Sequence, residues 1–402
     1  MKFQEGQLDK YPIYFNCPVC LTRNSGEIKR LPDRWDIKID NVNIIEDYNF
    51  KPEFLIILSG EFPATKMLLH EDSQEFNLFT SISPFLKHRP SDLDTFTRLQ
   101  NIIPAIVEND WRIIERITNL FFNNREEFIE QEITKLRVSP YFNIQEYELP
   151  RSVRDLVATI PRSFNQFNNI YNMSVEDIFK TISIQRTKNE SNYISFINSF
   201  TEDDISQILK RAFEIINNFI KNYRFFLPVI YLEGNSEDLD AIKEFEGLTT
   251  VSIDELDKFY LFAYESIMEC SELLLIIDNY VNKGSHEIFP KMKFNKFPPL
   301  NNLSDYRKLT KGNRLKVLAH KDNTISTIIS MNLEANLRNA IGHNNYKYEQ
   351  NSQKIAYKGS EIYLIEFANI CYQLLKIATY IWDVGFEFMN LKVHNDNISP
   401  II

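Results

Sequence analysis

The second half of the chain carries two long stretches whose apolar residues recur at alternating steps of three and four. One stretch is Leu256–Val281 and the other is Leu364–Gly385. This spacing places apolar side chains along one stripe of an α-helix, as in the packing seam of a helical bundle. Ser252 and Glu255 form a capping box before the first stretch, and Gly284 follows it as a C-terminal cap. The pattern predicts two long helices that pack against each other antiparallel.

Helical patterns also precede these seams. Ile106–Arg137 has the spacing of one long amphipathic helix. Thr201–Phe226 opens with acidic residues, which suit the positive end of a helix, and Pro228 is expected to end it. A further helix is predicted from about Thr324 through Leu337, and the last long helix is predicted to open at Ser360, after a polar segment with the pattern of a short hairpin.

The first ninety residues differ, because prolines interrupt them and short runs such as Trp35–Ile39 and Phe54–Leu58 favour strands. A helical pattern begins at Ser91. We therefore predict a mainly α fold with three parts: a smaller α+β or β-rich unit over residues 1–90, a helical middle region over 91–200, and an antiparallel helical bundle over 201–402.

Composition narrows the classes of function. The 402 residues are 44% hydrophobic and 25% charged, and the net charge of −10 disfavours nucleic-acid binding over the whole surface. The start of the chain is polar, and the longest apolar runs are far shorter than the ~20 residues of a membrane span. With four cysteines and no disulfide framework, these features favour a cytoplasmic protein without a membrane partner.

Reactive side chains are concentrated between Leu337 and Tyr346, where Arg338, Asn339 and His343 fall within six residues. Steps of 4, 3 and 4 also align Asn332, Asn336, Asn339 and His343 on one side of a helix. On an ideal helix, however, Arg338 and His343 lie about 140° apart. They can converge if the helix ends at Gly342, which is suited to a left-handed cap, or if the arginine reaches round the helix.

An arginine and a histidine together can cleave RNA without a metal ion. A neutral imidazole can take the proton of a 2′-hydroxyl that attacks the adjacent phosphate, or an imidazolium can protonate the leaving 5′-oxygen. The guanidinium can stabilise charge that builds on the phosphate oxygens. We expect Arg338 and His343 to be catalytic and Asn339 to support them, with no cofactor; the residues leave open whether the histidine is base or acid.

The arrangement Arg338-Asn339-x-x-x-His343, between two long bundle helices, resembles the signature of the HEPN superfamily. The resemblance covers roughly residues 200–390. It implies a helical bundle with metal-independent endoribonuclease activity, in which two subunits bring two motifs into one cleft. It further implies RNA as substrate, a homodimer, and a role in prokaryotic anti-phage defence or as a toxin, released by a phage or host trigger. Some members of the superfamily only bind a nucleotide or a protein partner.

Basic residues precede the motif, and they form either a solvated helix face or an RNA-tracking patch. They are Arg307, Lys308, Lys311, Arg314, Lys316 and Lys321. Arg151, Arg154 and Arg162 pose the same alternatives. Tyr346 can stack on an RNA base or pack at the edge of the bundle.

Cys17 and Cys20 have the spacing of a zinc knuckle, but a structural zinc site needs four ligands and the chain has no second such pair. We therefore expect a remnant without metal. The alternative for the whole chain is a non-catalytic helical sensor or scaffold that binds a protein or nucleotide partner, in which Arg338 forms an ion pair and His343 caps a helix.

Overall fold

The computed structural model describes residues 2–4, 8–17, 19–43, 54–66, 68–69, 101–136, 139, 141–142, 149–164, 174–232, 236–294 and 299–396. The chain forms two compact units, and each contains three separate segments. Unit 1 consists of Met1–Ala105, Ile220–Leu261 and Asn339–Tyr372. Unit 2 consists of Ile106–Phe219, Phe262–Arg338 and Gln373–Ile402. The helix start predicted at Ser91 lies outside the described residues.

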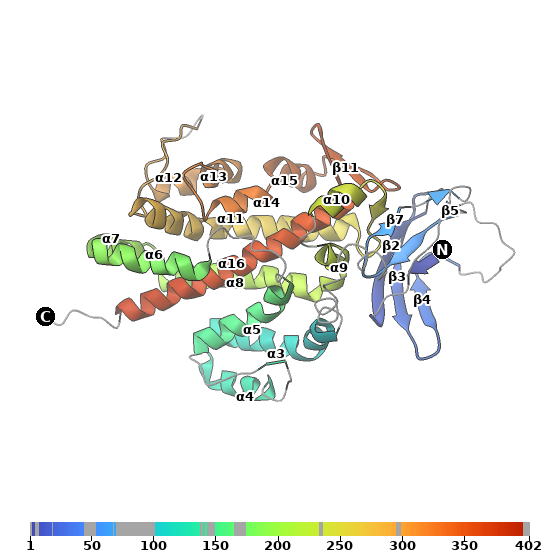
Figure 1. The fold of residues 1–402 in the computed structure, drawn as a ribbon, viewed down its shortest axis with the longest axis horizontal. Coiled ribbons are helices and arrows are strands. Elements are labelled where there is room, and N and C mark those ends of the chain that lie inside the picture. Colours follow the sequence, from blue (N-terminus) through green and yellow to red (C-terminus); the bar gives the residue numbers. More distant parts are fainter. Residues whose placement is uncertain are drawn as a thin grey trace. The chain divides into compact units, whose positions relative to one another are not determined.

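Unit 1 contains the N-terminal strands. An antiparallel sheet has the order β2 (Lys10–Asn16), β3 (Arg23–Arg30), β4 (Trp35–Ile39), and its strands lie side by side in Figure 1. Tyr11, Ile13 and Ile28 are buried on one face of this sheet, as the period of two in a strand requires. The remaining pairs are β1 (Lys2–Gln4) with β6 (Ile57–Ser59), β5 (Phe54–Leu55) with β8 (Leu68–Leu69), and β7 (Ala64–Thr65) with β9 (Glu246–Gly247).

Later segments complete unit 1. They supply α9 (Tyr223–Tyr231), α10 (Ser236–Ile242) and an antiparallel meander of β10 (Lys347–Glu349), β11 (Lys354–Tyr357) and β12 (Ser360–Tyr363). The predicted hairpin is confirmed. The helix start predicted at Ser360 is wrong, because Ser360 pairs with Tyr357 in β12 and α16 (Leu364–Asp396) begins after that strand.

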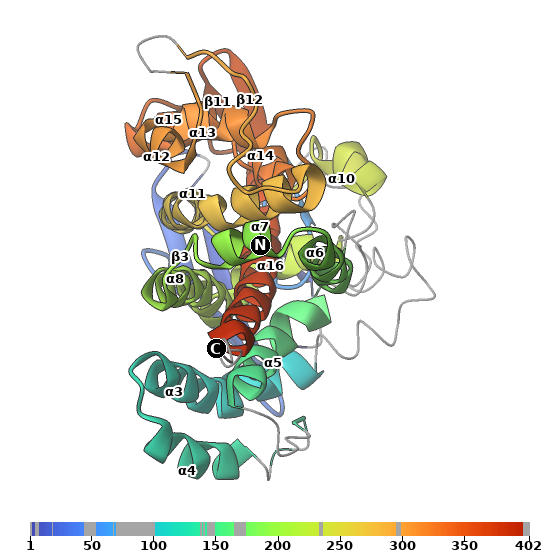
Figure 2. The same ribbon diagram turned by 90° about the vertical axis from the view of Figure 1, so that its left-hand side faces the viewer.

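Unit 2 is helical and layered around the later part of α11 (Ile253–Lys283). Figures 1 and 2 show α12, α13 and α14 on one side of α11, and α6, α7 and α8 on the other. The helices α3, α4 and α5 lie at the opposite end of the unit from α12 and α13 (Figure 2). The bounds are η3 (Ile106–Asp110, a π-helix), α3 (Trp111–Phe122), α4 (Glu126–Leu136), α5 (Leu149–Phe164), α6 (Val175–Lys188), α7 (Glu190–Ile197), α8 (Glu202–Lys221), α12 (Leu303–Lys308), α13 (Lys311–Leu318) and α14 (Thr327–Asn332).

The two predicted seam helices form as α11 and α16, with their apolar stripes buried. The caps of α11 are those predicted: Glu255 N donates to Ser252 Oγ (3.3 Å), and Gly284 has a φ of 73°. The antiparallel packing expected for this pair is wrong. Both helices begin in unit 1 and end in unit 2, so they run in the same direction. Within unit 1 the rings of Tyr260 and Phe367 meet at 5.3 Å.

Asparagines divide two segments that the apolar pattern presented as single helices. The Ile106–Arg137 segment breaks after α3, where Asn124 adopts a left-handed φ of 52°, a conformation that asparagine tolerates. The Thr201–Phe226 segment breaks at Asn222 instead of ending at Pro228, which lies inside α9. Apolar residues continue at helical spacing on both sides of each break, so the spacing alone does not reveal the break.

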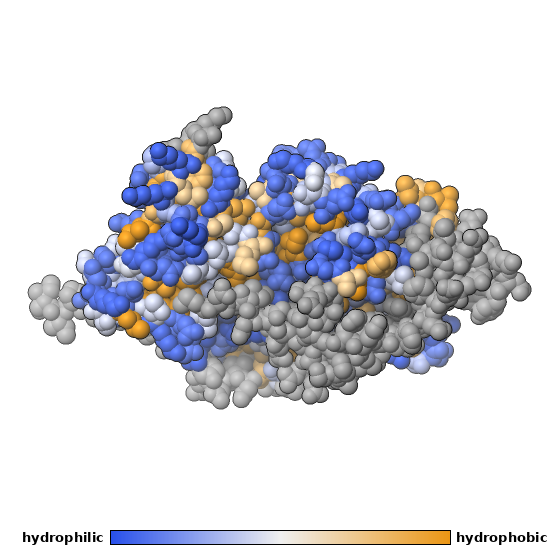
Figure 3. Space-filling view, turned by 45° about the horizontal axis from the view of Figure 1, so that its top comes forward, coloured by the Kyte–Doolittle hydropathy of each residue, from blue (hydrophilic) through white to orange (hydrophobic). Residues whose placement is uncertain are grey.

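The predicted fold class, mainly α with strands in the N-terminal part, is confirmed. None of the described helices combines the length and apolar character needed to cross a bilayer. On the face shown in Figure 3, hydrophilic residues predominate over the described surface, and apolar residues form smaller patches.

Candidate active site

The motif is carried by α15 (Ala335–Gly342), a short helix separate from α14. The two helices are separated at Leu333, whose backbone is extended (φ −111°, ψ 123°). The single helix predicted from Thr324 through Leu337 is therefore wrong. Asn332 belongs to α14, so the predicted stripe of asparagines on one helix face does not form.

The end of α15 is a Schellman motif whose left-handed residue lies two residues later in the chain than predicted. Asn345 N donates to Ala340 O (2.7 Å), and Asn344 N donates to Ile341 O (3.0 Å). Asn344, with a φ of 52°, takes the left-handed position that Gly342 was expected to take. His343 is consequently the C-cap residue, and its backbone N–H donates to Asn339 O (3.1 Å).

Arg338 is fixed by ion pairs within unit 2. Its Nε donates to Glu265 Oε1 (2.7 Å) on α11, and its second guanidinium nitrogen lies 2.6 Å from the same oxygen. Lys311 bonds to Glu265 Oε2 and also lies 3.6 Å from Glu269, which pairs with Arg211. Burial alone would raise the pKa of Glu265, but the bonds from Lys311 and Arg338 lower it. The carboxylate therefore stays charged and holds the arginine in place.

His343 has the opposite environment. Its side chain is exposed, and within the described part of the chain it makes no hydrogen bond or ion pair. Asn339 is also exposed. Because α15 stays helical through Gly342, Arg338 and His343 keep the separation of about 140° around the helix. The helix does end at Gly342, as one of the two expected routes to convergence required, but Asn344 and not Gly342 is the left-handed residue. Convergence of the two side chains stays a prediction.

Tyr346 anchors the loop that follows His343. Its hydroxyl donates to Asp257 Oδ2 (2.6 Å) near the start of α11, and both residues belong to unit 1. Burial raises the pKa of Asp257 to about 6, although the bond from Tyr346 acts to lower it. Burial and the adjacent carboxylate also raise the pKa of Tyr346. Base stacking by Tyr346 remains a prediction, and any such role would use its ring and not its hydroxyl.

Half of the predicted basic patch, three of its six residues, is paired with carboxylates of unit 2. Arg307 bonds to Glu272, Lys308 lies 3.6 Å from Asp305, and Lys311 bonds to Glu265. The Arg314 guanidinium lies over the Tyr306 ring, 5.4 Å from its centroid, and donates to Arg307 O. Among the described residues, Lys316 and Lys321 are exposed and make no ion pair, so they are the members best placed to contact phosphate.

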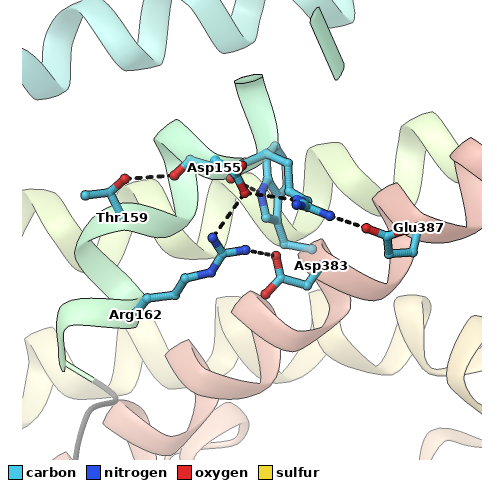
Figure 4. Close-up of polar contacts among 7 residues, drawn as sticks. Asp155, Thr159, Arg162, Asp383 and Glu387 are labelled. Carbon is cyan, nitrogen blue, oxygen red and sulfur yellow. Dashed lines mark hydrogen bonds and ion pairs between the residues drawn. The ribbon is translucent and has the colours of Figure 1, made fainter. Parts of the chain in front are cut away.

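The basic residues of α5 belong to a charged cluster with α16. Arg154 bonds to Asp155 and Glu387, and Arg162 bonds to Asp155 (3.1 Å) and Asp383 (2.7 Å), as Figure 4 shows. Trp382 Nε1 donates to Arg154 O (3.0 Å). Burial raises the pKa of Asp383 even though Arg162 acts to lower it. Arg154 and Arg162 thus form ion pairs that join α5 to α16.

Cys17 and Cys20 lie in the turn between β2 and β3. Cys17 N donates to Thr22 O (2.8 Å), and Leu21 adopts a left-handed φ of 60°. The hydrogen bond between Cys20 and Thr22 Oγ1 (3.1 Å) is the main cause that lowers the pKa of Cys20 to about 7. Among the described residues, no third metal-binding side chain joins this pair.

Two acidic residues of α11 that contact the motif region were not among the predicted site residues. Glu265 and Asp257 lie in the Leu256–Val281 seam region, beside the buried residues Tyr264 and Leu256. Acidic residues that flank a packing seam are a sequence signal for buried ion pairs, but the sequence does not reveal their partners.

No known protein family, curated protein or solved structure matches the chain.

Proposed function

We propose that this chain is a metal-independent endoribonuclease in which His343 transfers a proton and Arg338 stabilises charge on the phosphate. The observation that supports the proposal best is the contrast along α15. His343 is exposed at the C-cap, where a substrate can reach it, while Glu265 fixes the position of Arg338 five residues earlier. A fixed cation and an accessible imidazole are the two groups that phosphate transesterification requires as a minimum.

The reaction follows from these two groups. The 2′-hydroxyl of RNA loses its proton and attacks the adjacent phosphorus, and the bond to the 5′-oxygen breaks as that oxygen gains a proton. The products are a 2′,3′-cyclic phosphate and a 5′-hydroxyl. An imidazole can perform either proton transfer, so one histidine serves as base or acid and a second proton carrier completes the cycle.

A second copy of the chain is the source that we propose for the remaining groups. Arg338 and His343 lie about 140° apart around α15, so one copy presents them in different directions. The resemblance to the HEPN superfamily implies that two copies bring their motifs into one cleft. In that arrangement the exposed His343 would meet the phosphate together with groups from the second copy.

The test is cleavage of tRNA and total RNA in the presence of EDTA by the wild type, Arg338→Ala and His343→Ala. We expect both variants to lose at least about 100-fold in rate, because His343→Ala removes a proton-transfer group and Arg338→Ala removes the cation that stabilises the phosphate charge. His320→Ala is the matched control, because His320 is another partly accessible histidine, paired with Asp322 at 3.4 Å. A His343→Ala variant that cuts as fast as the wild type would refute the proposal. Wild-type protein that leaves RNA intact and also leaves host growth unchanged during phage infection would refute it as well.

The setting that we propose is anti-phage defence or a toxin. A nuclease that a phage component activates would be silent in the first assay. Growth of a bacterial host is therefore scored during expression, with and without phage infection. Arrested growth with the wild type but not with His343→Ala would support this setting, and equal growth in every arm would count against it.

One observation favours a second candidate, a non-catalytic helical sensor or scaffold. The chain of ion pairs Arg338–Glu265–Lys311–Glu269–Arg211 joins four helices and gives Arg338 a structural role. If packing is its only role, Arg338→Ala lowers the free energy of unfolding and His343→Ala changes nothing. Glu265→Gln separates the candidates. If Arg338 is only structural, the substitution removes its ion-pair partner and lowers the free energy of unfolding. If the chain is an enzyme, Arg338 stays charged but is held less precisely, so residual RNA cleavage remains.

A further inference from the structure

The turn between β2 and β3 carries two cysteines, Cys17 and Cys20, separated by two residues. Leu21 N donates to Cys17 O (2.9 Å), which closes one helix-like turn of the backbone. In such a turn the side chains of residues i and i+3 are neighbours, with Cβ atoms about 5–6 Å apart. A disulfide needs Cα atoms within about 7 Å of each other. The backbone therefore brings the two cysteines close to the distance that a disulfide requires.

Backbone hydrogen bonds hold this turn in its conformation. Cys17 N donates to Thr22 O (2.8 Å), directly beyond the last strand pair, Asn16 with Arg23. Leu21 adopts a left-handed φ of 60°, which is uncommon for a residue other than glycine and persists only where the surrounding structure holds it. The two thiols are therefore presented by a turn that is already formed at both ends.

The surroundings of the Cys20 sulfur favour its thiolate. Cys20 Sγ lies 3.1 Å from Thr22 Oγ1, whose hydroxyl can donate a hydrogen bond to a thiolate. This bond, followed by bonds from the Thr22 backbone and the Cys17 side chain, lowers the pKa of Cys20 to about 7. About half of the Cys20 thiols are therefore ionised at neutral pH, and the thiolate is the nucleophilic form.

Exposure to solvent distinguishes the two cysteines of the turn. Cys20 is exposed, and so are its neighbours Val19 and Leu21, at 73% and 53% of their full surface. Cys17 is only partly exposed. A reagent in solution therefore reaches Cys20 more readily than Cys17. This difference gives Cys20 the role of the attacking thiol and leaves Cys17 to react second.

The other two cysteines of the chain have the opposite properties. Cys270 on α11 and Cys371 on α16 are fully buried. Burial raises the pKa of Cys270 to about 12 and also raises the pKa of Cys371. Both thiols stay protonated and out of contact with solvent, and buried cysteines of this kind are inert. The chain therefore contains one reactive pair of thiols and two internal controls.

We propose that Cys17 and Cys20 form a redox-active dithiol that exchanges with small-molecule disulfides of the glutathione type. The Cys20 thiolate attacks one sulfur of the oxidised glutathione, the S–S bond of glutathione breaks, and one glutathione leaves as a thiolate. Cys17 then loses its proton to solvent and attacks Cys20 Sγ, which forms the Cys17–Cys20 disulfide and releases the second glutathione.

The exchange is balanced, because two cysteine thiols are oxidised while one glutathione disulfide is reduced to two thiols. Reduced glutathione in excess reverses both steps, so the site responds to the ratio of the two forms. This inference does not depend on the proposed ribonuclease activity, because no group of the Arg338–His343 motif takes part in the exchange.

The experiment incubates the reduced full chain with oxidised glutathione at pH 7 and follows the intact mass and the peptide map. We expect a loss of two hydrogen atoms and a Cys17–Cys20 disulfide. Cys17→Ser should stop at one glutathione joined to Cys20, Cys20→Ser should react at least 10-fold more slowly, and the control Cys270→Ala should react like the wild type. Wild type that does not react, or Cys20→Ser that reacts as fast, would overturn the proposal.

Alkylation by iodoacetamide tests the assigned roles without an oxidant. In the folded wild type the rate at Cys20 should rise with pH through a midpoint near 7, the pKa of its thiol. Thr22→Val removes the hydroxyl beside the sulfur, so the midpoint should move to higher pH. Cys270 and Cys371 should be alkylated only in urea. Labelling of Cys270 as fast as Cys20 in the folded chain, or an unchanged midpoint in Thr22→Val, would contradict the assignment.

Discussion

Two sets of polar side chains, one in each unit, differ in whether their polar atoms have hydrogen-bond or ion-pair partners. In the α5–α16 cluster of unit 2, Arg154 and Arg162 are matched by carboxylates on facing helices (Figure 4). In the β10–β11 turn of unit 1, Gln350 Oε1 is buried and has no partner in the described chain. The first arrangement is what packing requires, and the second leaves a buried acceptor unpaired at a cost in free energy. Matched charges alone are therefore poor indicators of function.

The motif contains both kinds of environment. Arg338 is matched by Glu265, as in the α5–α16 cluster, and His343 is exposed without a partner in the described chain. This difference is why we expect His343→Ala to separate catalysis from stability more cleanly than Arg338→Ala. We therefore expect substitutions of side chains with buried partners to lower the free energy of unfolding more than substitutions of side chains without them.

The largest effect on stability is expected at Asp278, a fully buried carboxylate of unit 2. It accepts hydrogen bonds from Ser326 N (2.9 Å), Ser326 Oγ (2.8 Å) and Thr324 N (3.1 Å), which begin α14. Asp278→Ala should lower the free energy of unfolding in urea by about 4 kcal/mol, because several buried donors lose a charged acceptor. Asp322→Ala, at an exposed aspartate, should cost less than about 1 kcal/mol. Equal losses would contradict this assignment.

A smaller loss is expected from the α5–α16 cluster. Arg162→Ala removes the partner of Asp383 and should lower the free energy of unfolding by about 2 kcal/mol, because a half-buried carboxylate is left without its hydrogen bond. Arg125→Ala is the control, since Arg125 is exposed and lies 3.6 Å from Glu127. Urea denaturation of both variants measures the difference. The assignment fails if the two substitutions cost the same.

The β10–β11 turn of unit 1 contains two glutamines, Gln350 and Gln353, whose contributions to stability can be compared. Only Gln353 is hydrogen-bonded to the backbone of Leu248. Gln353→Leu removes both bonds to the backbone of Leu248 and should cost about 1.5 kcal/mol in urea denaturation. Gln350→Leu, three residues earlier in the same turn, should cost nothing. A reversed order of the two losses would show that the unpaired acceptor is the structural one.

The smallest effect depends on pH and concerns Asp257. Burial, together with Asp254, raises its pKa from 3.8 to about 6 in the folded chain. A raised carboxyl pKa contributes stability that is complete below about 4 and is lost as pH rises through about 6. Asp257→Asn, which keeps an acceptor for Tyr346 but no charge, should therefore gain stability relative to the wild type between pH 4 and pH 7.5. A difference that stays constant across this range in urea titrations would contradict the assignment.

Local chemistry was enough to predict several features. The three-and-four spacing predicted the buried stripes of α11 and α16, and Ser252 and Gly284 predicted the ends of α11. These features depend on backbone geometry within a few residues, so they can be inferred without knowing what the helix packs against. The same spacing did not reveal the breaks at Asn124, Asn222 and Leu333, since the core-facing pattern continues across each of them.

By itself, the sequence determined the mainly α character of the chain, its N-terminal strands and the grouping of Arg338, Asn339 and His343. Only the tertiary structure decided that Glu265 holds Arg338, that Asn344 ends α15 and leaves His343 exposed, and that the Gln350 amide oxygen is buried without a partner in the described chain. The physical reason is that propensity and periodicity act over one or two turns. Ion pairs and unpaired buried acceptors depend on which side chains the folded chain brings together.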